Sequence, residues 1–235
     1  MTPRQLYSDP PRIHTDDAGR VHGDWALAPE ALLVIEHVTH PGDRTLETGA
    51  GITTALLALL GAEHTAITPD AAEVRRLQEY CSRHGISTDR VRFHIGYSQD
   101  ILPALTPGEL DLVIIDGSHA FPIPFLDWYF SAAHLREGGL VLIDDTQLWT
   151  GEVLRDFLSA EAGWQHECTP DRAAVFRKVA PFDRAVSWVH QPYVTQRSLV
   201  WHDGAWRRAS GRGNNAPMCP PRRSPAEPGS GHRSS

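Results

Sequence analysis

The sequence predicts an α/β fold built on one mostly parallel sheet, and three observations point to it. Short apolar runs alternate with segments of helical periodicity between residues 44 and 160, which is the pattern of repeated strand and helix units. Gly49 and Gly51 lie where one apolar run gives way to a helical one, as at the first strand-to-helix turn of open α/β sheets. Two final strand candidates, 164–168 and 173–179, are joined by a short Thr-Pro-Asp turn and should pair antiparallel.

Five strand candidates precede this closing pair, which predicts a sheet of seven strands that ends in an antiparallel hairpin. They are residues 44–48, 64–68, 91–95, 111–116 and 139–144. A helix is expected from Pro124, with Trp128, Ala132 and Leu135 on one face and a stop at Gly138-Gly139. Further helices are expected where Val74, Leu77 and Cys81 recur at helical spacing, and over residues 152–160.

Composition predicts one globular domain with flanking segments. The chain has 235 residues, 41% of them hydrophobic and 22% charged, which suits one domain over residues 41–180 after a leader or lid over 1–40. A small added hairpin is expected over 181–206, where Asp203-Gly204 signals a turn. From residue 207 Arg, Ser, Gly and Pro predominate, which predicts a disordered tail. Whether the hairpin covers the site or forms a homodimer contact stays open.

Charge and cysteine content exclude several classes of protein. The formal net charge is −7, and the tail's six arginines and one glutamate contribute +5, which leaves −12 on residues 1–206. That sign disfavours a nucleic-acid substrate. The apolar runs are too short to span a bilayer, and Cys81, Cys168 and Cys219 lack disulfide or zinc-site spacing. We therefore expect a cytoplasmic protein without nucleic-acid or membrane partners.

The segment 46–54, Leu-Glu-Thr-Gly-Ala-Gly-Ile-Thr-Thr, predicts a cofactor cradle. Gly49 and Gly51 let the backbone turn sharply and a ligand approach closely, and Thr53 opens the helical run that follows. Glu47 would repel a dinucleotide pyrophosphate and attract an ammonium group, which S-adenosylmethionine carries. Thr54 replaces the third glycine of the dinucleotide fingerprint, which further disfavours NAD. On this segment alone, an ordinary strand-to-helix turn is an equally good interpretation.

From about residue 44 to 179 the chain resembles the class I S-adenosylmethionine-dependent methyltransferases, and its second half is closest to the catechol O-methyltransferase type. The most specific residues are 96–103, Gly-Tyr-Ser-Gln-Asp-Ile-Leu-Pro. In that family this segment follows the third strand and its Ser and Gln contact adenine, which implies that Ser98 and Gln99 do so here. A second interpretation is a capped helix start, with Ser98 or Asp100 satisfying free backbone amides, and the two interpretations are compatible.

Two buried strand candidates end in acids, at Asp116 and at Asp144-Asp145. Neighbouring parallel strands would bring these acids together at the carboxyl edge of the sheet, where ligands of open α/β folds bind. Clustered carboxylates repel one another unless a cation lies among them, and hard oxygen ligands suit Mg²⁺ or Mn²⁺. The resemblance assigns the same three acids to Mg²⁺, although Asp145 stands where the family has Asn. Metal-free enzymes often keep such acids as turn formers or helix caps.

His119 lies three residues after Asp116, at the spacing where the catechol type carries its lysine general base. A neutral imidazole can take a hydroxyl proton near neutral pH. The resemblance therefore implies that His119 is the catalytic base. The alternative is a histidine that only forms a hydrogen bond within its loop.

The ribose-binding acid of the family is missing from its usual place. The second strand candidate runs Ala66-Ile67-Thr68-Pro69-Asp70, with Ala or Thr where the acid would fall. Asp70 is the substitute that lies at a suitable distance from the glycines. Because Asp after Pro is equally suited to cap the following helix, both roles stay open.

Aromatic residues near these motifs are candidates for substrate contacts. Phe121 and Phe125 follow His119, and Trp149 follows the acid pair, so that apolar walls would flank the reacting hydroxyl. Trp25 in the leader is a candidate lid, but for Trp25 and Trp128 we favour packing in the core.

Together these features predict an S-adenosylmethionine-dependent methyltransferase that acts on a hydroxyl of a small molecule with a divalent metal ion. The sequence leaves three alternatives open. The first is a metal-independent class I methyltransferase acting on N or O, the second a non-catalytic protein that binds S-adenosylmethionine, and the third an NAD-dependent enzyme. The identity of the methyl acceptor cannot be inferred from the residues.

Overall fold

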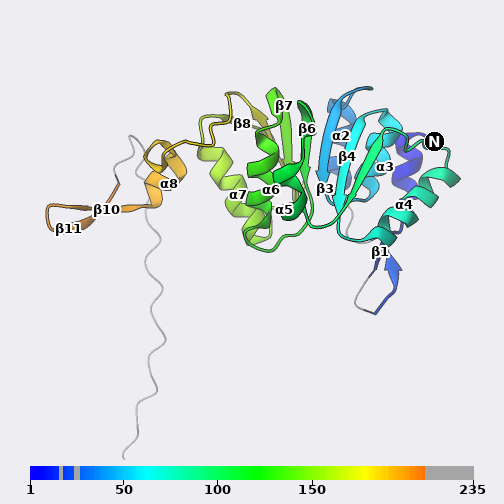
Figure 1. Ribbon diagram of the computed structural model, residues 1–235, viewed down its shortest axis with the longest axis horizontal. Helices are drawn as coiled ribbons and strands as arrows, with labels where there is room; N and C mark the ends of the chain where they lie inside the picture. Colours follow the sequence, from blue (N-terminus) through cyan, green and yellow to red (C-terminus); the bar gives the residue numbers. More distant parts are fainter. Residues whose placement is uncertain (16–17, 24–26, 210–235) are drawn as a thin grey trace, which may run out of the picture.

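The computed structural model describes residues 1–15, 18–23 and 27–209, and its centre is one seven-stranded sheet (Figure 1). The strand order is β5-β4-β3-β6-β7-β9-β8. Strands β3 to β7 run parallel, whereas β9 pairs antiparallel with both β7 and β8. The strands are β3 (Arg44–Thr48), β4 (Glu63–Thr68), β5 (Val91–Ile95), β6 (Leu110–Ile115), β7 (Leu135–Ile143), β8 (Trp164–Cys168) and β9 (Ala174–Lys178). The predicted α/β fold with a terminal antiparallel hairpin is confirmed.

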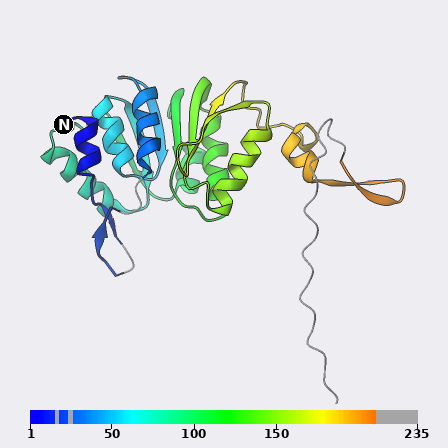
Figure 2. The same cartoon turned by 180° about the vertical axis from the view of Figure 1, so that it is seen from behind.

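Helices cover both faces of this sheet, which explains why its central strands are apolar throughout. Successive side chains of a strand point to opposite faces, and in β6 Leu112 and Ile114 join one core cluster while Val113 and Ile115 join the other. Helices α1–α4 pack in the first cluster and α5–α7 in the second, as the two opposite views show (Figures 1 and 2). These helices are α1 (Pro3–Ser8), α2 (Pro29–Val38), α3 (Ile52–Leu60), α4 (Ala71–Arg83), α5 (Ser98–Ile101), the 3₁₀ turn η1 (Leu102–Ala104), α6 (Ile123–Ala132) and α7 (Trp149–Ala160).

The first 40 residues contribute to the core. Leu6 of α1 and Ile35 of α2 are fully buried in the first cluster. Between these helices, β1 (His14–Thr15) and β2 (Val21–His22) form a short antiparallel hairpin. The predicted leader therefore supports the sheet, and its hairpin brings His14 to the candidate site. Trp25 lies outside the described residues.

The predicted end of α6 at Gly138-Gly139 is wrong. The helix ends at Ala132, and Leu135 begins strand β7, where it pairs with Leu110. The register of this pair shifts between Leu110 and Leu112, so the glycines lie within an irregular strand rather than behind a helix. Trp128 is buried in the core, as expected.

The segment after β9 forms a short helix, in which Tyr193 packs against Phe157 of α7, and a hairpin that is separate from the central sheet (Figure 1). Positive φ angles of 51° at Asp203 and 76° at Gly204 form the predicted turn. Strand β11 runs to Arg208, two residues into the predicted tail, and residues from 210 onward lie outside the described part. The elements are η2 (Trp188–His190), α8 (Pro192–Arg197), β10 (Leu199–His202) and β11 (Ala205–Arg208).

None of the helices in the described ranges is long and apolar enough to cross a membrane.

Candidate functional site

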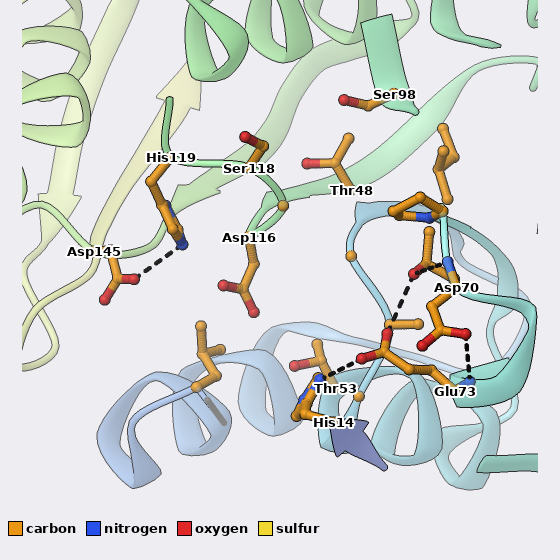
Figure 3. A pocket seen from close by; sticks show the side chains of 18 of the residues that line it. His14, Thr48, Thr53, Asp70, Glu73, Ser98, Asp116, Ser118, His119 and Asp145 are labelled. Carbon is orange, nitrogen blue, oxygen red and sulfur yellow. Dashed lines mark hydrogen bonds and ion pairs between the residues drawn. The ribbon is translucent and has the colours of Figure 1, made fainter. Parts of the chain in front are cut away.

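A cavity of about 620 Å³ lies at the carboxyl ends of β3, β4 and β6, the position expected for ligands of an open α/β sheet (Figure 3). Most of the predicted site residues line it, whereas Glu47 and Asp144 are not among its lining residues. The predicted residues that line it are Gly49, Gly51, Thr53, Asp70, Ser98, Gln99, Asp116, His119 and Asp145.

The loop from β3 to α3 passes close against the end of β6. Gly49 has a φ of 117°, and a Cβ at this position would lie 2.6 Å from the carbonyl oxygen of Asp116. Only glycine accommodates this approach. Helix α3 then begins at Ile52, and its N-cap Gly51 provides no side-chain cap, so that the first backbone amides of the helix are available to an anionic ligand group.

Glu47 does not reach the cavity, contrary to the expected contact with the cofactor. Its side chain is 1% exposed, accepts a hydrogen bond of 2.7 Å from the Thr54 hydroxyl, and lies 3.2 Å from Nε2 of His64. The physical reason is strand alternation. Because Leu46 points into the core under α6 and α7, Glu47 must point to the opposite face, where α3 lies.

Glu73 is a cavity residue that the sequence reasoning missed. Asp70 caps helix α4, since its Oδ1 accepts hydrogen bonds from the backbone N–H of Ala72 and Glu73. Glu73 lies one helical turn further along. Its Oε1 is 2.9 Å from Nδ1 of His14, and its Oε2 accepts a hydrogen bond of 3.3 Å from the Thr68 hydroxyl. The spacing Asp70-x-x-Glu73 signals a capping box, but the Glu73 side chain lies in the cavity (Figure 3).

Asp116 and Asp144 form a close pair of carboxyl groups at the sheet edge. Burial raises the pKa of Asp116 well above its ordinary value, and the charges of Asp144, Glu47 and Asp145 raise it further. Burial also raises the pKa of Asp144, which is 3% exposed, while the positive charge of Arg172 opposes that shift. The convergence of the two strand ends is thus as expected, and the pair holds a proton more readily than isolated carboxyl groups.

Asp145 contacts two nitrogen-bearing side chains, those of His119 and Arg172, across the site. Its Oδ2 lies 3.0 Å from Nε2 of His119, and its Oδ1 lies 3.1 Å from Nε of Arg172 and accepts a 2.7 Å hydrogen bond from Gln147. Asp145 has a positive φ of 52°, a conformation that Asn and Asp adopt more readily than most residues. His119 and Asp145 lie on the side of the cavity opposite Asp70 and Glu73 (Figure 3).

These contacts do not fit the expected divalent ion. Both carboxylate oxygens of Asp145 already face hydrogen-bond donors, which leaves Asp116 and Asp144 as carboxylate ligands, whereas an ion such as Mg²⁺ requires a near-ideal octahedral set of oxygens. Within residues 1–15, 18–23 and 27–209, no three His, Cys, Asp or Glu side chains are arranged to hold a metal ion. The buried Oδ1 of Asp144 makes no hydrogen bond among these residues, but faces Nε of Arg172 at 3.9 Å.

Ser98 and Gln99 begin helix α5 and line the cavity. The helix has Tyr97 as its N-cap, without a side-chain capping bond, so the alternative of a helix start capped by Ser98 or Asp100 is not formed. Beneath Ser98 lies Asp127 of α6, which the sequence reasoning missed. Its carboxylate is 1% exposed, and neither oxygen makes a hydrogen bond within the described part of the chain. Burial raises the pKa of Asp127 to about 6, although the nearby hydroxyls of Ser98 and Thr48 counteract the shift.

We expect Asp127→Asn to stabilise the protein above pH 6. A folded-state pKa of about 6 against an ordinary value of 3.8 means that ionising Asp127 costs more in the folded than in the unfolded chain. The cost is complete above pH 6, decreases as the pH falls through this window, and vanishes below pH 3.8. The gain should be about 2–3 kcal/mol at pH 8, measured by denaturant unfolding. Exposed Asp89→Asn serves as control, and an equal gain for Asp127→Asn at pH 4 would contradict the assignment.

Exposed aromatic side chains lie beside His119. Phe121 and Trp149 have exposed fractions of 64% and 62% and ring centroids 5.8 Å apart. Thr150, next to Trp149, donates a 2.6 Å hydrogen bond to the backbone carbonyl of His119, which ties α7 to this loop. An apolar surface therefore borders the site at the position of the base candidate.

Comparisons with known proteins agree with the fold and with the cofactor motif. The family model of a methyltransferase domain matches residues 46–146. The chain is 32% identical to the catechol O-methyltransferase of Mycobacterium tuberculosis (strain ATCC 25618 / H37Rv) over 126 residues, which are 51% of this chain and 54% of that protein. Together with the sheet order, these matches show that residues 46–146 are similar to class I methyltransferase domains. The chain spans about half the length of this curated relative.

Solved structures share the fold at low sequence identity. The O-methyltransferase TomG from Streptomyces achromogenes, in complex with S-adenosylmethionine, has a TM-score of 0.54 and 18% identity over 67% of this chain and 83% of its own. An rRNA methylase from Streptococcus thermophilus has a TM-score of 0.50 and 14% identity over 64% of this chain and 95% of its own. Because both kinds of enzyme share this architecture, the fold alone does not define the substrate.

Proposed function

We propose that the protein transfers the methyl group of S-adenosylmethionine to a hydroxyl group of a small molecule. The observation that carries this proposal is the contact between His119 and Asp145 in the same cavity as the glycine loop. Methyl transfer to a hydroxyl needs a group that takes the hydroxyl proton and a site that holds the methyl donor. His119, held by Asp145, provides the first, and the cavity beside the glycine loop provides the second.

The cavity offers a complementary group for each part of the cofactor. The open N-terminus of α3 suits the methionine carboxylate, and Asp116, against Gly49, suits the ammonium in place of Glu47. Glu73 suits the ribose hydroxyls, because a carboxylate accepts hydrogen bonds from a diol. Ser98 and Gln99 suit the adenine on the remaining side.

His119 acts as the base in this proposal. When Nε2 carries the hydrogen and donates it to Asp145, Nδ1 has the free lone pair that accepts the proton of the acceptor hydroxyl. The oxygen then attacks the methyl carbon in line with its bond to sulfur, since both reactants are held in one cavity. S-adenosylhomocysteine and the methyl ether leave, and His119 releases the proton to solvent.

The surroundings favour a small acceptor with an apolar body. Phe121 and Trp149 border the base, and a net charge of −12 on residues 1–206 opposes the binding of a phosphate backbone. Because the acids do not form the expected ligand set, we propose that the reaction proceeds without a divalent ion, the alternative that the sequence left open.

The proposal is tested by calorimetric titration followed by a transfer assay. The protein should bind S-adenosylhomocysteine with a micromolar dissociation constant and NAD much more weakly. Radiolabelled S-adenosylmethionine should then transfer its methyl group to members of a panel of phenols, catechols and other small alcohols. Equal affinity for NAD would overturn the cofactor assignment, and a lack of transfer to every hydroxyl acceptor would favour a non-catalytic binding protein.

We expect Glu73→Gln to weaken S-adenosylhomocysteine binding by about 10-fold to 100-fold, because a charge-assisted hydrogen bond contributes about 1.5–3 kcal/mol. Titration calorimetry measures the change. Glu79→Gln, on an exposed position of the same helix, should leave the affinity unchanged. If Asp70→Asn weakens binding and Glu73→Gln does not, Asp70 is the ribose acid and the assignment of Glu73 is wrong.

A further inference from the structure

Arg172 is fixed beside the acid pair by its own backbone. It lies in the turn between β8 and β9, and its carbonyl oxygen accepts hydrogen bonds of 2.8 Å from the backbone N–H and 2.7 Å from the hydroxyl of Thr146. Thr146 directly follows Asp145 and is 5% exposed. The two loops are therefore joined at the point where β7 ends, although Arg172 lies 27 positions after Asp145 in the sequence.

The guanidinium group of Arg172 lies beside both acids, and the side chain lines the cavity. Its Nε is 3.1 Å from Oδ1 of Asp145 and 3.9 Å from Oδ1 of Asp144, and the side chain is 34% exposed. Arginine has five N–H donors in a fixed fork and stays charged at any physiological pH. Because it has five donors, an arginine that faces Asp145 can also donate to a further acceptor.

We propose that Arg172 takes the role of a divalent ion in this site, as the positive charge that stabilises the acceptor oxygen during methyl transfer. The inference rests on the proposed function. As the O–H bond of the acceptor breaks, its proton passes to Nδ1 of His119, and a guanidinium N–H donates to the oxygen that becomes negative. The new O–C bond forms while the S–C bond breaks, and the electron pair of that bond neutralises the sulfonium.

The same cation explains the aspartate at position 145. A third carboxylate beside Asp116 and Asp144 is unfavourable unless a fixed positive charge accompanies it. Arg172 and His119 contact opposite oxygens of Asp145, so that Asp145 orients the base with one oxygen and the cation with the other. Asp145 is thus a positioning residue, whereas Arg172 and His119 contact the reacting oxygen.

The first test measures metal binding without turnover. Mn²⁺ is titrated into the full chain saturated with S-adenosylhomocysteine and followed by electron paramagnetic resonance. We expect no site below millimolar concentration in the wild type. Arg172→Gln should bind Mn²⁺ at least tenfold more tightly, because it leaves the acids without their guanidinium partner. Arg155→Gln removes an exposed cation from α7 and should behave as the wild type. Micromolar Mn²⁺ binding by the wild type would overturn the proposal.

The second test uses the acceptor identified in the transfer assay. Exhaustive chelation should leave wild-type kcat unchanged, whereas Arg172→Gln should lower kcat at least 100-fold. Arg172→Lys should retain part of the activity, and addition of Mn²⁺ should restore part of it to Arg172→Gln. Loss of wild-type turnover on chelation, or full kcat in Arg172→Gln, contradicts the role of Arg172. A failure of the proposed function gives a different result, since the wild type would then bind no S-adenosylhomocysteine or methylate no acceptor.

Discussion

His119→Ala should lower kcat by about 10²-fold to 10⁴-fold, the usual contribution of a general base. The dissociation constant of S-adenosylhomocysteine should change little, because the ring contacts Asp145 on the side of the cavity away from Glu73. Single-turnover kinetics with a saturating acceptor measure the chemical step directly. Exposed His190→Ala should retain full activity.

Two further variants test whether His119 is the base or only supports its loop. His119→Lys replaces the imidazole with a base that deprotonates at higher pH, so partial activity with an upward shift of the pH optimum supports the role. Asp145→Asn fits the positive φ of 52° but no longer holds the Nε2 hydrogen of His119 with a charge, and should lower kcat without unfolding the protein. Full kcat in His119→Ala at every pH would show that the histidine is only loop structure.

The parts of the fold that follow from local pattern were predicted well. Strands β3, β5 and β8 have the expected bounds, and the antiparallel pairing of β8 with β9 is confirmed. These strands are short segments that lie between clear turn and helix signals, so each is identified without knowledge of its neighbours. The end of α6 was wrong because Gly138 and Gly139 are local helix-stop signals, whereas the irregular register of β7 depends on its partner strand.

The site was predicted less completely because it depends on the direction in which side chains point and on contacts between residues far apart in the sequence. The sequence identified the acids at the strand ends, but not that Glu47 points away from the cavity, since the facing of a strand is set by the whole sheet. Glu73 was missed because the side of α4 that meets the cavity depends on tertiary packing. No local pattern linked Arg172 to Asp145, because the connection runs through the carbonyl of Arg172 and Thr146.

The second large effect is expected at the glycine loop. Gly49→Ala places a Cβ 2.6 Å from the carbonyl oxygen of Asp116, a backbone atom that cannot turn aside as a flexible side chain would. The φ of 117° is also strained for any residue with a Cβ. Crowding and strain each cost on the order of 1–3 kcal/mol. The loop must move away from β6, which displaces the N-terminus of α3 and Asp116 together.

We therefore expect Gly49→Ala to weaken S-adenosylhomocysteine binding at least 100-fold and to lower the midpoint of thermal unfolding, measured by calorimetry on the same samples. Gly85→Ala is the matched control, because Gly85 also has a positive φ, 68°, but a Cβ there meets nothing within 4 Å. It should show backbone strain alone, as a lower unfolding midpoint with unchanged affinity. If Gly49→Ala binds the ligand as the wild type does, the close approach of the loop to Asp116 is not what shapes the cofactor site.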